Sequence, residues 1–90
     1  MFRIQVLVSG DVQGVWFRIS TQHKANELGL KGWVKNLFSN AVEIKAEGTM
    51  EDLSLMIGWL QEGPPNARVE KLSINWDISK NEFVRFEIKK

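Results

Sequence analysis

The sequence predicts an α+β fold in which an antiparallel sheet carries two helices on one of its faces. Three observations lead to this prediction. Several segments alternate apolar and polar residues as half-buried strands do, and two others repeat apolar residues at helical spacing. These segments follow one another as strand, helix, strand, strand, helix, strand, with a short final strand. Because each strand has one apolar face, both helices should cover the same side of one sheet.

The first half of the chain is expected to form a strand, a helix and a hairpin. In residues 2–9 the side chains expected to face the core are Phe2, Ile4, Val6 and Val8. Those expected to face solvent are Arg3, Gln5, Leu7 and Ser9. From Arg18 the spacing is helical, and one stripe of this helix contains Phe17, Thr21, Ala25 and Leu28. Gly29 is a natural residue to end this helix, because glycine readily adopts the left-handed conformation after a last turn.

The hairpin is predicted to join a second strand, residues 31–37, to a third. Ser39-Asn40 marks a tight turn, because Asn tolerates positive φ better than most residues. In the third strand the residues expected to face inward are Val42, Ile44 and Ala46. Those expected to face outward are Glu43, Lys45 and Glu47.

The second half of the chain is expected to repeat the pattern of helix and strand. Thr49 and Asp52 have the spacing of a helix N-cap, and an apolar stripe follows at Leu53, Met56, Ile57 and Leu60. Gly63-Pro64-Pro65 ends this helix because proline cannot continue it. Two strands follow, with inward residues Leu72, Ile74 and Trp76 in one and Val84, Phe86 and Ile88 in the other. This order of elements is the split β-α-β arrangement of ferredoxin-like folds, a two-layer α/β sandwich.

Length, charge and cysteine content narrow the class of protein. Ninety residues are expected to make a single domain, residues 1–90, since two separate cores would each be too small. A formal net charge of +1 argues against broad electrostatic capture of nucleic acid or of an anionic membrane. The absence of cysteine excludes disulfides and thiolate metal sites and favours a cytoplasmic protein. The apolar segment at residues 1–10 is too short for a signal peptide or a membrane span.

The segment from Gly10 to Arg18 has the composition of an anion-binding loop. Its two glycines permit backbone conformations that turn several amide N–H groups toward one point, and the following helix N-terminus adds unpaired donors. Arg18 lies in the first helical turn and supplies a permanent cation whose planar guanidinium fits a phosphate. Gly14 is not followed by the Lys-Ser/Thr of a Walker loop. From these residues alone, a phosphate site and a simple tight connection both stay open.

A second segment, Gly32 to Asn36, ends a predicted strand with an unusual residue. Asn is depleted in strands, so Asn36 either terminates the strand or aims a polar group into a neighbouring site. In a split β-α-β fold the first strand lies centrally. The hypothesis is that the end of the second strand comes near the Gly10–Arg18 loop.

Together the two segments resemble the acylphosphatase family, whose first loop reads G-x-V-Q-G-V-x-F-R and whose second motif reads G-[aromatic]-V-[K/R]-N. The residues that match the first motif are Gly10, Val12, Gln13, Gly14, Val15, Phe17 and Arg18. Those that match the second are Gly32, Trp33, Val34, Lys35 and Asn36. The resemblance spans essentially the whole chain and is to the small, stand-alone prokaryotic type.

The resemblance implies a hydrolase that splits the carboxyl–phosphate anhydride of acyl phosphates into carboxylate and inorganic phosphate, with no metal and no cofactor. In this family an arginine and loop amides hold the phosphoryl group and an asparagine positions the attacking water, so the resemblance gives these roles to Arg18 and Asn36. The amides carried over are those of Asp11, Val12, Gln13, Gly14, Val15 and Trp16. The expected partners are a small acyl phosphate and inorganic phosphate, without nucleic acid or membrane. A monomer is the simplest oligomeric state.

Three residues depart from the family pattern. Asp11 stands where the family often has a basic or small residue, and it puts a negative charge beside the expected phosphate site. Trp16 replaces a residue that is usually small, so its indole is expected to lid the pocket or to crowd it. Asn40 takes the place of a turn glycine, which bears on stability only.

The other residues that could carry chemistry have plainer interpretations. His23, in mid-helix, is expected to be a solvated surface residue. Glu43 and Glu47 share a strand face and are expected to belong to a solvated surface of mixed charge rather than to act as paired carboxylates. Trp59 and Trp76 are expected to pack in the core.

Two alternative functions stay open. The RNA-recognition motif shares this fold, but it stacks bases on aromatic residues of its central strands, and the predicted outward residues here include no aromatic. A binding or regulatory domain could keep the anion pocket and lack turnover, as acylphosphatase-like modules do at the start of larger carbamoyl-transfer enzymes. Turnover of an acyl phosphate separates these readings.

Overall fold

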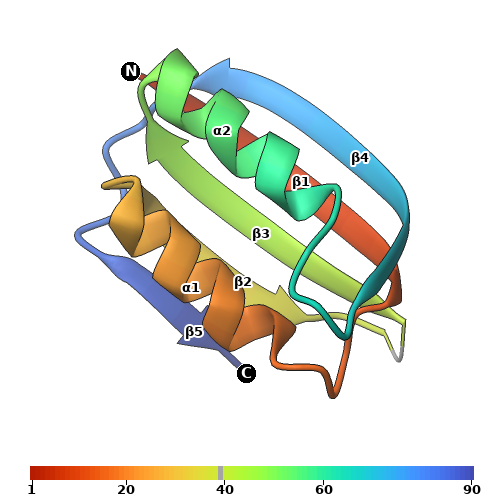
Figure 1. Cartoon of the computed structure of the whole chain (residues 1–90). Helices are drawn as coiled ribbons and strands as arrows, with labels where there is room; N and C mark the ends of the chain where they lie inside the picture. Colours follow the sequence, from red (N-terminus) through yellow and green to blue (C-terminus); the bar gives the residue numbers. More distant parts are fainter. Residues whose placement is uncertain (39) are drawn as a thin grey trace.

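The computed structural model describes residues 1–38 and 40–90. In these residues two helices lie on one face of a sheet of five strands (Figure 1). The strands are β1 (Phe2–Asp11), β2 (Lys31–Asn36), β3 (Ala41–Gly48), β4 (Arg68–Ile78) and β5 (Phe86–Lys89). The helices are α1 (Phe17–Glu27) and α2 (Met50–Leu60). The predicted α+β, ferredoxin-like sandwich is confirmed. The predicted Ser39-Asn40 turn includes residue 39, which lies outside the described residues.

The sheet is mixed, with strand order β4-β1-β3-β2-β5. The pairs β1–β3, β1–β4 and β2–β3 are antiparallel, whereas β2 and β5 are parallel. The prediction of an antiparallel sheet is therefore wrong for the last pair. Because β4 and β5 lie at opposite edges, residues 79–85 must cross the sheet, and the chain then enters β5 in the direction of β2 (Figure 1).

The core lies between the helices and the sheet, as the apolar patterns predict. Helix α1 packs over β2 and β5, and α2 over β1 and β3. The buried residues of the central strands include Ile4, Val6, Val8, Val42, Ile44 and Ala46. Those of the helices are Phe17, Thr21, Ala25, Leu53, Met56 and Leu60. These sets confirm the predicted helical stripes and the inward residues of the first and third strands.

The helix ends also form where the sequence predicts them. Gly29 follows α1 with φ 71°, and the Leu30 amide donates to the carbonyl of Ala25 at 2.8 Å, as in a Schellman motif. At α2, the Thr49 hydroxyl accepts a hydrogen bond of 3.1 Å from the Asp52 amide. Local capping chemistry therefore fixes where α1 ends and where α2 begins.

The last two strands differ from their predictions. β4 is longer than the predicted core of residues 72–76, and as an edge strand it leaves Trp76 44% exposed, against the ring of Phe2 at 6.5 Å between centroids. Core packing is thus confirmed for Trp59, which lies 6.0 Å from Phe17, and wrong for Trp76. Val84 is 81% exposed because the strand begins only at Phe86.

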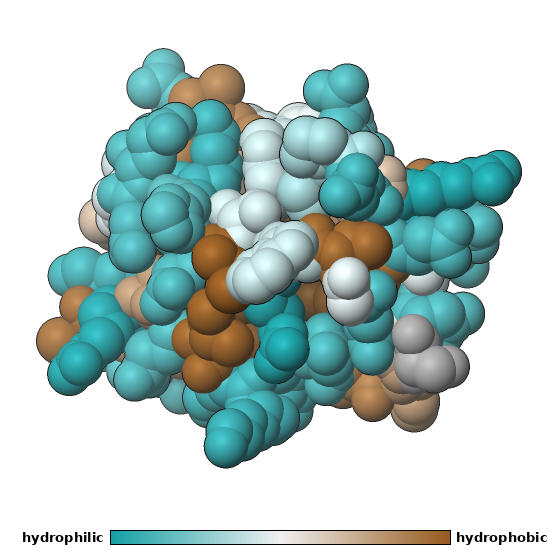
Figure 2. Space-filling view, turned by 60° about the horizontal axis from the view of Figure 1, so that its bottom comes forward, coloured by the Kyte–Doolittle hydropathy of each residue, from teal (hydrophilic) through white to brown (hydrophobic). Residues whose placement is uncertain are grey.

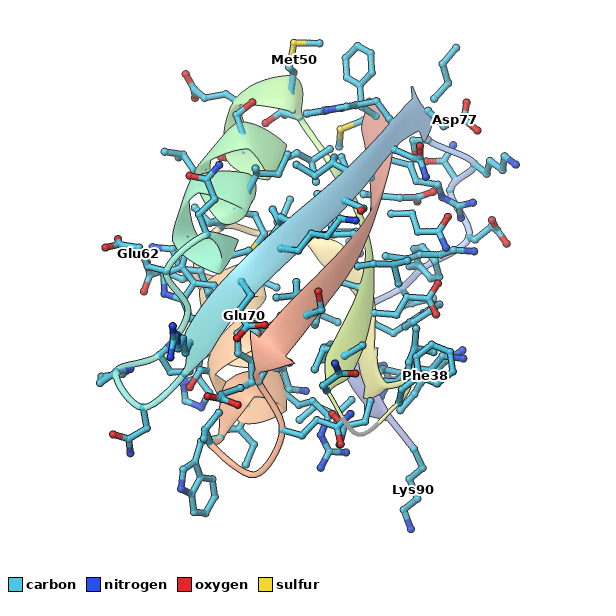
Figure 3. The ribbon with its side chains drawn as sticks, turned by 90° about the vertical axis from the view of Figure 1, so that its right-hand side faces the viewer. Phe38, Met50, Glu62, Glu70, Asp77 and Lys90 are labelled. Atoms are coloured by element: carbon cyan, nitrogen blue, oxygen red, sulfur yellow. The ribbon has the colours of Figure 1, made fainter. Side chains whose placement is uncertain are left out.

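The face of the sheet opposite the helices is partly covered, and two of its charges are buried. Arg3 is 8% exposed and Glu47 7% exposed, so the predicted solvent-facing placement is wrong for both. Residues 79–85 cross this region: the Lys80 amide donates to the Glu47 carboxylate at 2.9 Å, and Phe83 lies 5.2 Å from the Arg3 guanidinium. Figure 3 views the molecule from the side, with the helices on one side and Phe38 on the other.

Opposing effects act on the ionisation of Glu47. Burial raises the pKa of the Glu47 carboxyl, but hydrogen bonds from the Lys80 amide and the Ser79 hydroxyl, together with Arg3, lower it further than burial raises it. The net result is a pKa below the usual value for glutamate. The Nε of Arg3 donates to the same carboxylate at 3.1 Å, so Glu47 is a buried anion held by three donors.

Candidate active site

Near its end, β1 makes a close backbone approach to β4 just before the loop that follows. Gly10 has φ 131°, at an irregularity in the β1–β4 pairing between Ser9 and Gly10. A Cβ at this position would lie 2.2 Å from the carbonyl oxygen of Arg68, which leaves room only for glycine. The strand continues past this irregularity to Asp11, and the chain then turns toward the start of α1.

The loop presents unbonded amides and an uncapped helix N-terminus. Gly14 has φ 74°, and the N-cap residue Trp16 is left-handed at φ 65° and ψ 21°. Within the described residues, no hydrogen bond is donated by the amides of residues 12–19, and no side chain caps the helix. These N–H groups and the positive end of the helix dipole make a site suited to an anion.

A pocket of about 460 Å³ lies at this end of the molecule, beside the N-terminus of α1. It is lined by Val12, Gln13, Gly14, Trp16, Phe17, Arg18, Ile19, Asn36 and Ile88. Figure 2 views this end, where hydrophobic side chains (brown) and hydrophilic side chains (teal) meet at the centre of the face. The lining comes from the loop, from α1, from the end of β2 and from β5, so the fold itself assembles the pocket.

The pocket brings together most of the residues singled out in the two sequence motifs. Arg18 and Asn36 line it from α1 and β2, so the hypothesis that the end of the second strand comes near the loop is confirmed. Val12, Gln13, Gly14 and Trp16 also line it. Asp11 and Val15 do not: Asp11 is the exposed last residue of β1, opposite Arg68, and Val15 packs against the core.

Arg18 and Asn36 each have unused hydrogen-bonding capacity. Arg18 is half-buried, and none of the ion pairs formed among residues 1–38 and 40–90 involves it. The Asn36 Oδ1 atom is buried and has no hydrogen-bond partner in that same part of the chain. A buried polar atom without a partner costs free energy, so Oδ1 is suited to accept a hydrogen bond from a molecule in the pocket.

The side chain of Gln13 has a role that the sequence motifs do not reveal. Its Nε2 donates to the carbonyl of Ala41 at 2.7 Å and also to the carbonyl of Phe38. These bonds tie the loop to the connection between β2 and β3. The Gly10 amide adds a third bond, to the carbonyl of Asn40 at 3.0 Å. Loop and hairpin therefore form one unit.

One side of the pocket is apolar, and sequence reasoning missed it. Ile19 lies off the buried stripe of α1, and Ile88 was assigned to the core but is 37% exposed at the pocket. An apolar residue on the polar side of a helix was the available signal for Ile19. Trp16 is 71% exposed and lines the pocket, so its indole lies at the rim. The expectation that it lids or crowds the pocket stays a prediction.

Comparison with known proteins decides the family. A family model described as Acylphosphatase matches residues 4–88. The chain belongs to the acylphosphatase family. An acylphosphatase from Methylococcus capsulatus is 47% identical over 88 residues, 98% of this chain and 96% of that protein. The crystal structure of acylphosphatase from Bacillus subtilis superposes with a TM-score of 0.95 at 36% identity and covers 100% of both chains. An acylphosphatase from Coxiella burnetii gives 0.90 at 42% identity, over 97% of this chain and 90% of that one.

Membership of the acylphosphatase family fixes the reaction class. The known activity of the family is the hydrolysis of acyl phosphates, so the chain is a hydrolase that acts on acid anhydrides. Its substrate is a small acyl phosphate, and inorganic phosphate is a product. This assignment favours turnover over the two alternatives of RNA recognition and passive anion binding. No helix in residues 1–38 and 40–90 is long and apolar enough to cross a membrane.

Proposed function

We propose that the enzyme hydrolyses acyl phosphates without a metal ion, using its backbone amides and Arg18 to hold the phosphoryl group and Asn36 to hold the attacking water. The observation that carries this proposal is that Arg18 and Asn36 line one pocket at the uncapped N-terminus of α1. The positive charge of Arg18 can then bind the phosphoryl group, while the unpaired Oδ1 of Asn36 can accept a hydrogen bond from the water.

The phosphoryl group is assigned to the polar part of the pocket. Its oxygens accept hydrogen bonds from the amides of Val12, Gln13, Gly14 and Trp16, which are unbonded within the described chain. Asp11 precedes these amides, and Val15 lies between Gly14 and Trp16 with an amide that is likewise unbonded within the described chain. Arg18 adds a permanent charge, and its fork of donors fits phosphoryl oxygens. Because no carboxylate pairs with it in the described residues, its charge is available to the substrate.

The reaction is a displacement at phosphorus. The water oxygen forms a new bond to phosphorus while the bond from phosphorus to the carboxyl oxygen breaks, and the carboxylate leaves with the electron pair. The water proton goes to a phosphoryl oxygen, so the step needs no protein base. Oδ1 of Asn36 accepts a hydrogen bond from the water and orients it. Because carboxylate is a good leaving group, positioning and stabilisation of charge on the phosphoryl oxygens supply the catalysis, and Arg18 with the amides takes the place of a metal.

Asp11 does not oppose this arrangement strongly. Its carboxylate is exposed on the last residue of β1, and it does not line the pocket. Water and salt screen an exposed charge from a site to which it has no direct contact. We therefore propose that the negative charge of Asp11 has little effect on phosphate affinity.

Two measurements test whether water attacks phosphorus and whether Asn36 positions that water. Hydrolysis of benzoyl phosphate in ¹⁸O-labelled water should place the label in inorganic phosphate; label in benzoate would mean attack at the carbonyl carbon and would refute the displacement at phosphorus. Asn36→Ala should lower kcat about 10²–10³-fold and leave inhibition by inorganic phosphate unchanged. Asn26→Ala, on the exposed side of α1, is the matched control.

We also propose that the enzyme is a single domain of residues 1–90 that works in the cytoplasm as a monomer, without nucleic-acid or membrane partners. The absence of cysteine and the net charge of +1 support this. On the open face of the sheet, Trp33 is 9% exposed beneath Lys35, Lys45 and Lys89, 5.0–5.8 Å from its ring, which leaves it unavailable for base stacking. Light scattering should give the mass of one chain, and a dimer would refute the monomer.

A further inference from the structure

We infer that the pocket also selects the acyl group: Trp16, Ile19 and Ile88 form an apolar wall that receives it, so the enzyme prefers acyl phosphates whose acyl group is large and apolar. This inference rests on the proposed function, in which the phosphoryl group occupies the polar part of the same pocket. It goes beyond that function because it names the part of the substrate that the remaining space accepts.

The size of the pocket points to a ligand larger than phosphate. Pockets that hold whole small molecules have volumes of roughly 300–1,000 Å³, and this one, at about 460 Å³, falls in that range. A phosphoryl group held by Arg18 and the loop amides leaves most of that volume unused. The rest of the substrate is the acyl group.

The polar and apolar parts of the lining come from different elements. The loop amides, Arg18 and Asn36 form the polar part. Ile88 lies on β5, the edge strand, where it pairs with Val34 of β2, two residues before Asn36. Ile19 follows Arg18 on α1, which packs over β5. The apolar wall is therefore built between α1 and the edge of the sheet, next to the phosphoryl position rather than on it.

The three side chains of the wall are exposed. Trp16 is 71% exposed, Ile19 42% and Ile88 37%. Burial of such apolar surface against an apolar acyl group is favourable, whereas a small or polar acyl group would leave it in water. The wall thus distinguishes acyl groups by the apolar surface that they cover.

The backbone of Trp16 is a second sign that this side chain is placed for function. A left-handed conformation is costly for a residue with a Cβ, and such strain concentrates at functional sites. Here the strain sets the indole at the rim of the pocket, beside the unbonded amides. We assign to it the outer part of the wall, over the acyl group.

The test compares substrates that share the phosphoryl group and differ in the acyl group. kcat/KM is measured for acetyl phosphate and benzoyl phosphate with the wild type, Ile88→Ser and Ile19→Ser, and the ratio of the two is compared between proteins, which cancels their intrinsic reactivities. One methylene in an apolar pocket changes discrimination about 10-fold or more. The benzoyl-to-acetyl ratio should therefore fall about 10-fold in each variant. Leu55→Ser, at an exposed position on α2, is the control and should keep the ratio.

Binding separates this inference from the proposed function. Acetonylphosphonate and phenacylphosphonate replace the bridging oxygen by CH₂ and are not hydrolysed. The wild type should bind phenacylphosphonate about 10-fold more tightly or better, and both variants should lose that preference with no change in inhibition by inorganic phosphate. An unchanged preference in both variants, with circular dichroism unchanged, would overturn the apolar wall even if acetyl phosphate is turned over. Hydrolysis that does not depend on Arg18 would overturn the proposed function instead.

Discussion

The side-chain amide of Gln13 donates a hydrogen bond of 2.7 Å to the carbonyl oxygen of Ala41, the first residue of β3. The bond joins the loop after β1 to a neighbouring strand, and a second bond from the same nitrogen reaches the Phe38 carbonyl. Because the amides of residues 12–16 form no hydrogen bonds of their own within the described chain, the loop depends on these bonds for its shape. A site made of backbone donors is only as well organised as the loop that carries it.

Removal of this bond should reduce activity without removing a catalytic group. Gln13→Ala is expected to lower kcat/KM for benzoyl phosphate about 10–100-fold, because small displacements of positioning groups cost that much in rate. Gln5→Ala is the matched control, since it also removes a glutamine hydrogen bond, to Glu43 on the open face at 2.6 Å. Steady-state kinetics of both variants decide the matter; equal effects would show that Gln13 acts through general stability.

Substitution of Trp16 with glycine should stabilise the folded protein. Trp16→Gly removes the penalty of a left-handed backbone with a Cβ, about 1–2 kcal/mol, and adds unfolded-state entropy that costs about 0.4–1 kcal/mol. The free energy of unfolding in urea should therefore rise by up to about 1.6 kcal/mol. Asn81 also has positive φ, at 53°, but Asn tolerates it, so Asn81→Gly should bring no gain. A destabilised Trp16→Gly would show that indole packing outweighs the strain.

The buried pair of Arg3 and Glu47 should make stability depend on acidity. The pKa of Glu47 lies below its usual value in the folded chain because the Lys80 amide, the Ser79 hydroxyl and Arg3 together outweigh the effect of burial. A lowered folded-state pKa contributes stability above the unfolded pKa of about 4.3, and that contribution is lost as the pH falls through the folded value. At pH 7, Glu47→Gln should cost about 3 kcal/mol, the lower end for breaking a buried pair, because Glu82 still contacts Arg3.

Denaturation at several pH values checks this assignment. The difference in unfolding free energy between wild type and Glu47→Gln should be constant near neutral pH and shrink below about pH 4.3. Glu27→Gln is the control, since its ion pair with Lys24 is largely exposed on the side of Glu27 and should contribute less than about 1 kcal/mol. A difference that does not vary with pH would contradict the assignment.

Local patterns in the sequence predict much of the site, since each motif places its functional residues at a strand end or a helix start. Gly10 and Arg18 bracket a strand end and a helix start, and each position has the backbone and charge that the motif requires. The apolar wall was not predicted because it joins Ile19 and Ile88, whose contact with one pocket depends on the parallel pairing of β5 with β2. The bonds of Gln13 to the hairpin were missed for the same reason: nothing local marks them.

The fold was predicted where each element covers its own apolar face and missed where a distant segment does the covering. The apolar stripes of α1 and α2, the end of α1 at Gly29 and the start of α2 at Thr49 follow from residues close together in the sequence. The burial of Glu47 depends on residues 79–85, more than thirty positions away, which cross the sheet. The exposure of Trp76 follows from the edge position of β4, which alternation of residues cannot reveal.

The most direct test of the central claim is the activity of Arg18→Ala beside the wild type, with benzoyl phosphate as substrate and a chelator present. The wild type should turn over in the chelator, and the variant should lose at least about 100-fold in kcat/KM, because removal of one preorganised donor to the developing charge costs about 10²–10³. Inhibition by inorganic phosphate should weaken in the same variant. A wild type that stops in the chelator, or a folded Arg18→Ala that keeps full activity, would contradict metal-free hydrolysis at this pocket.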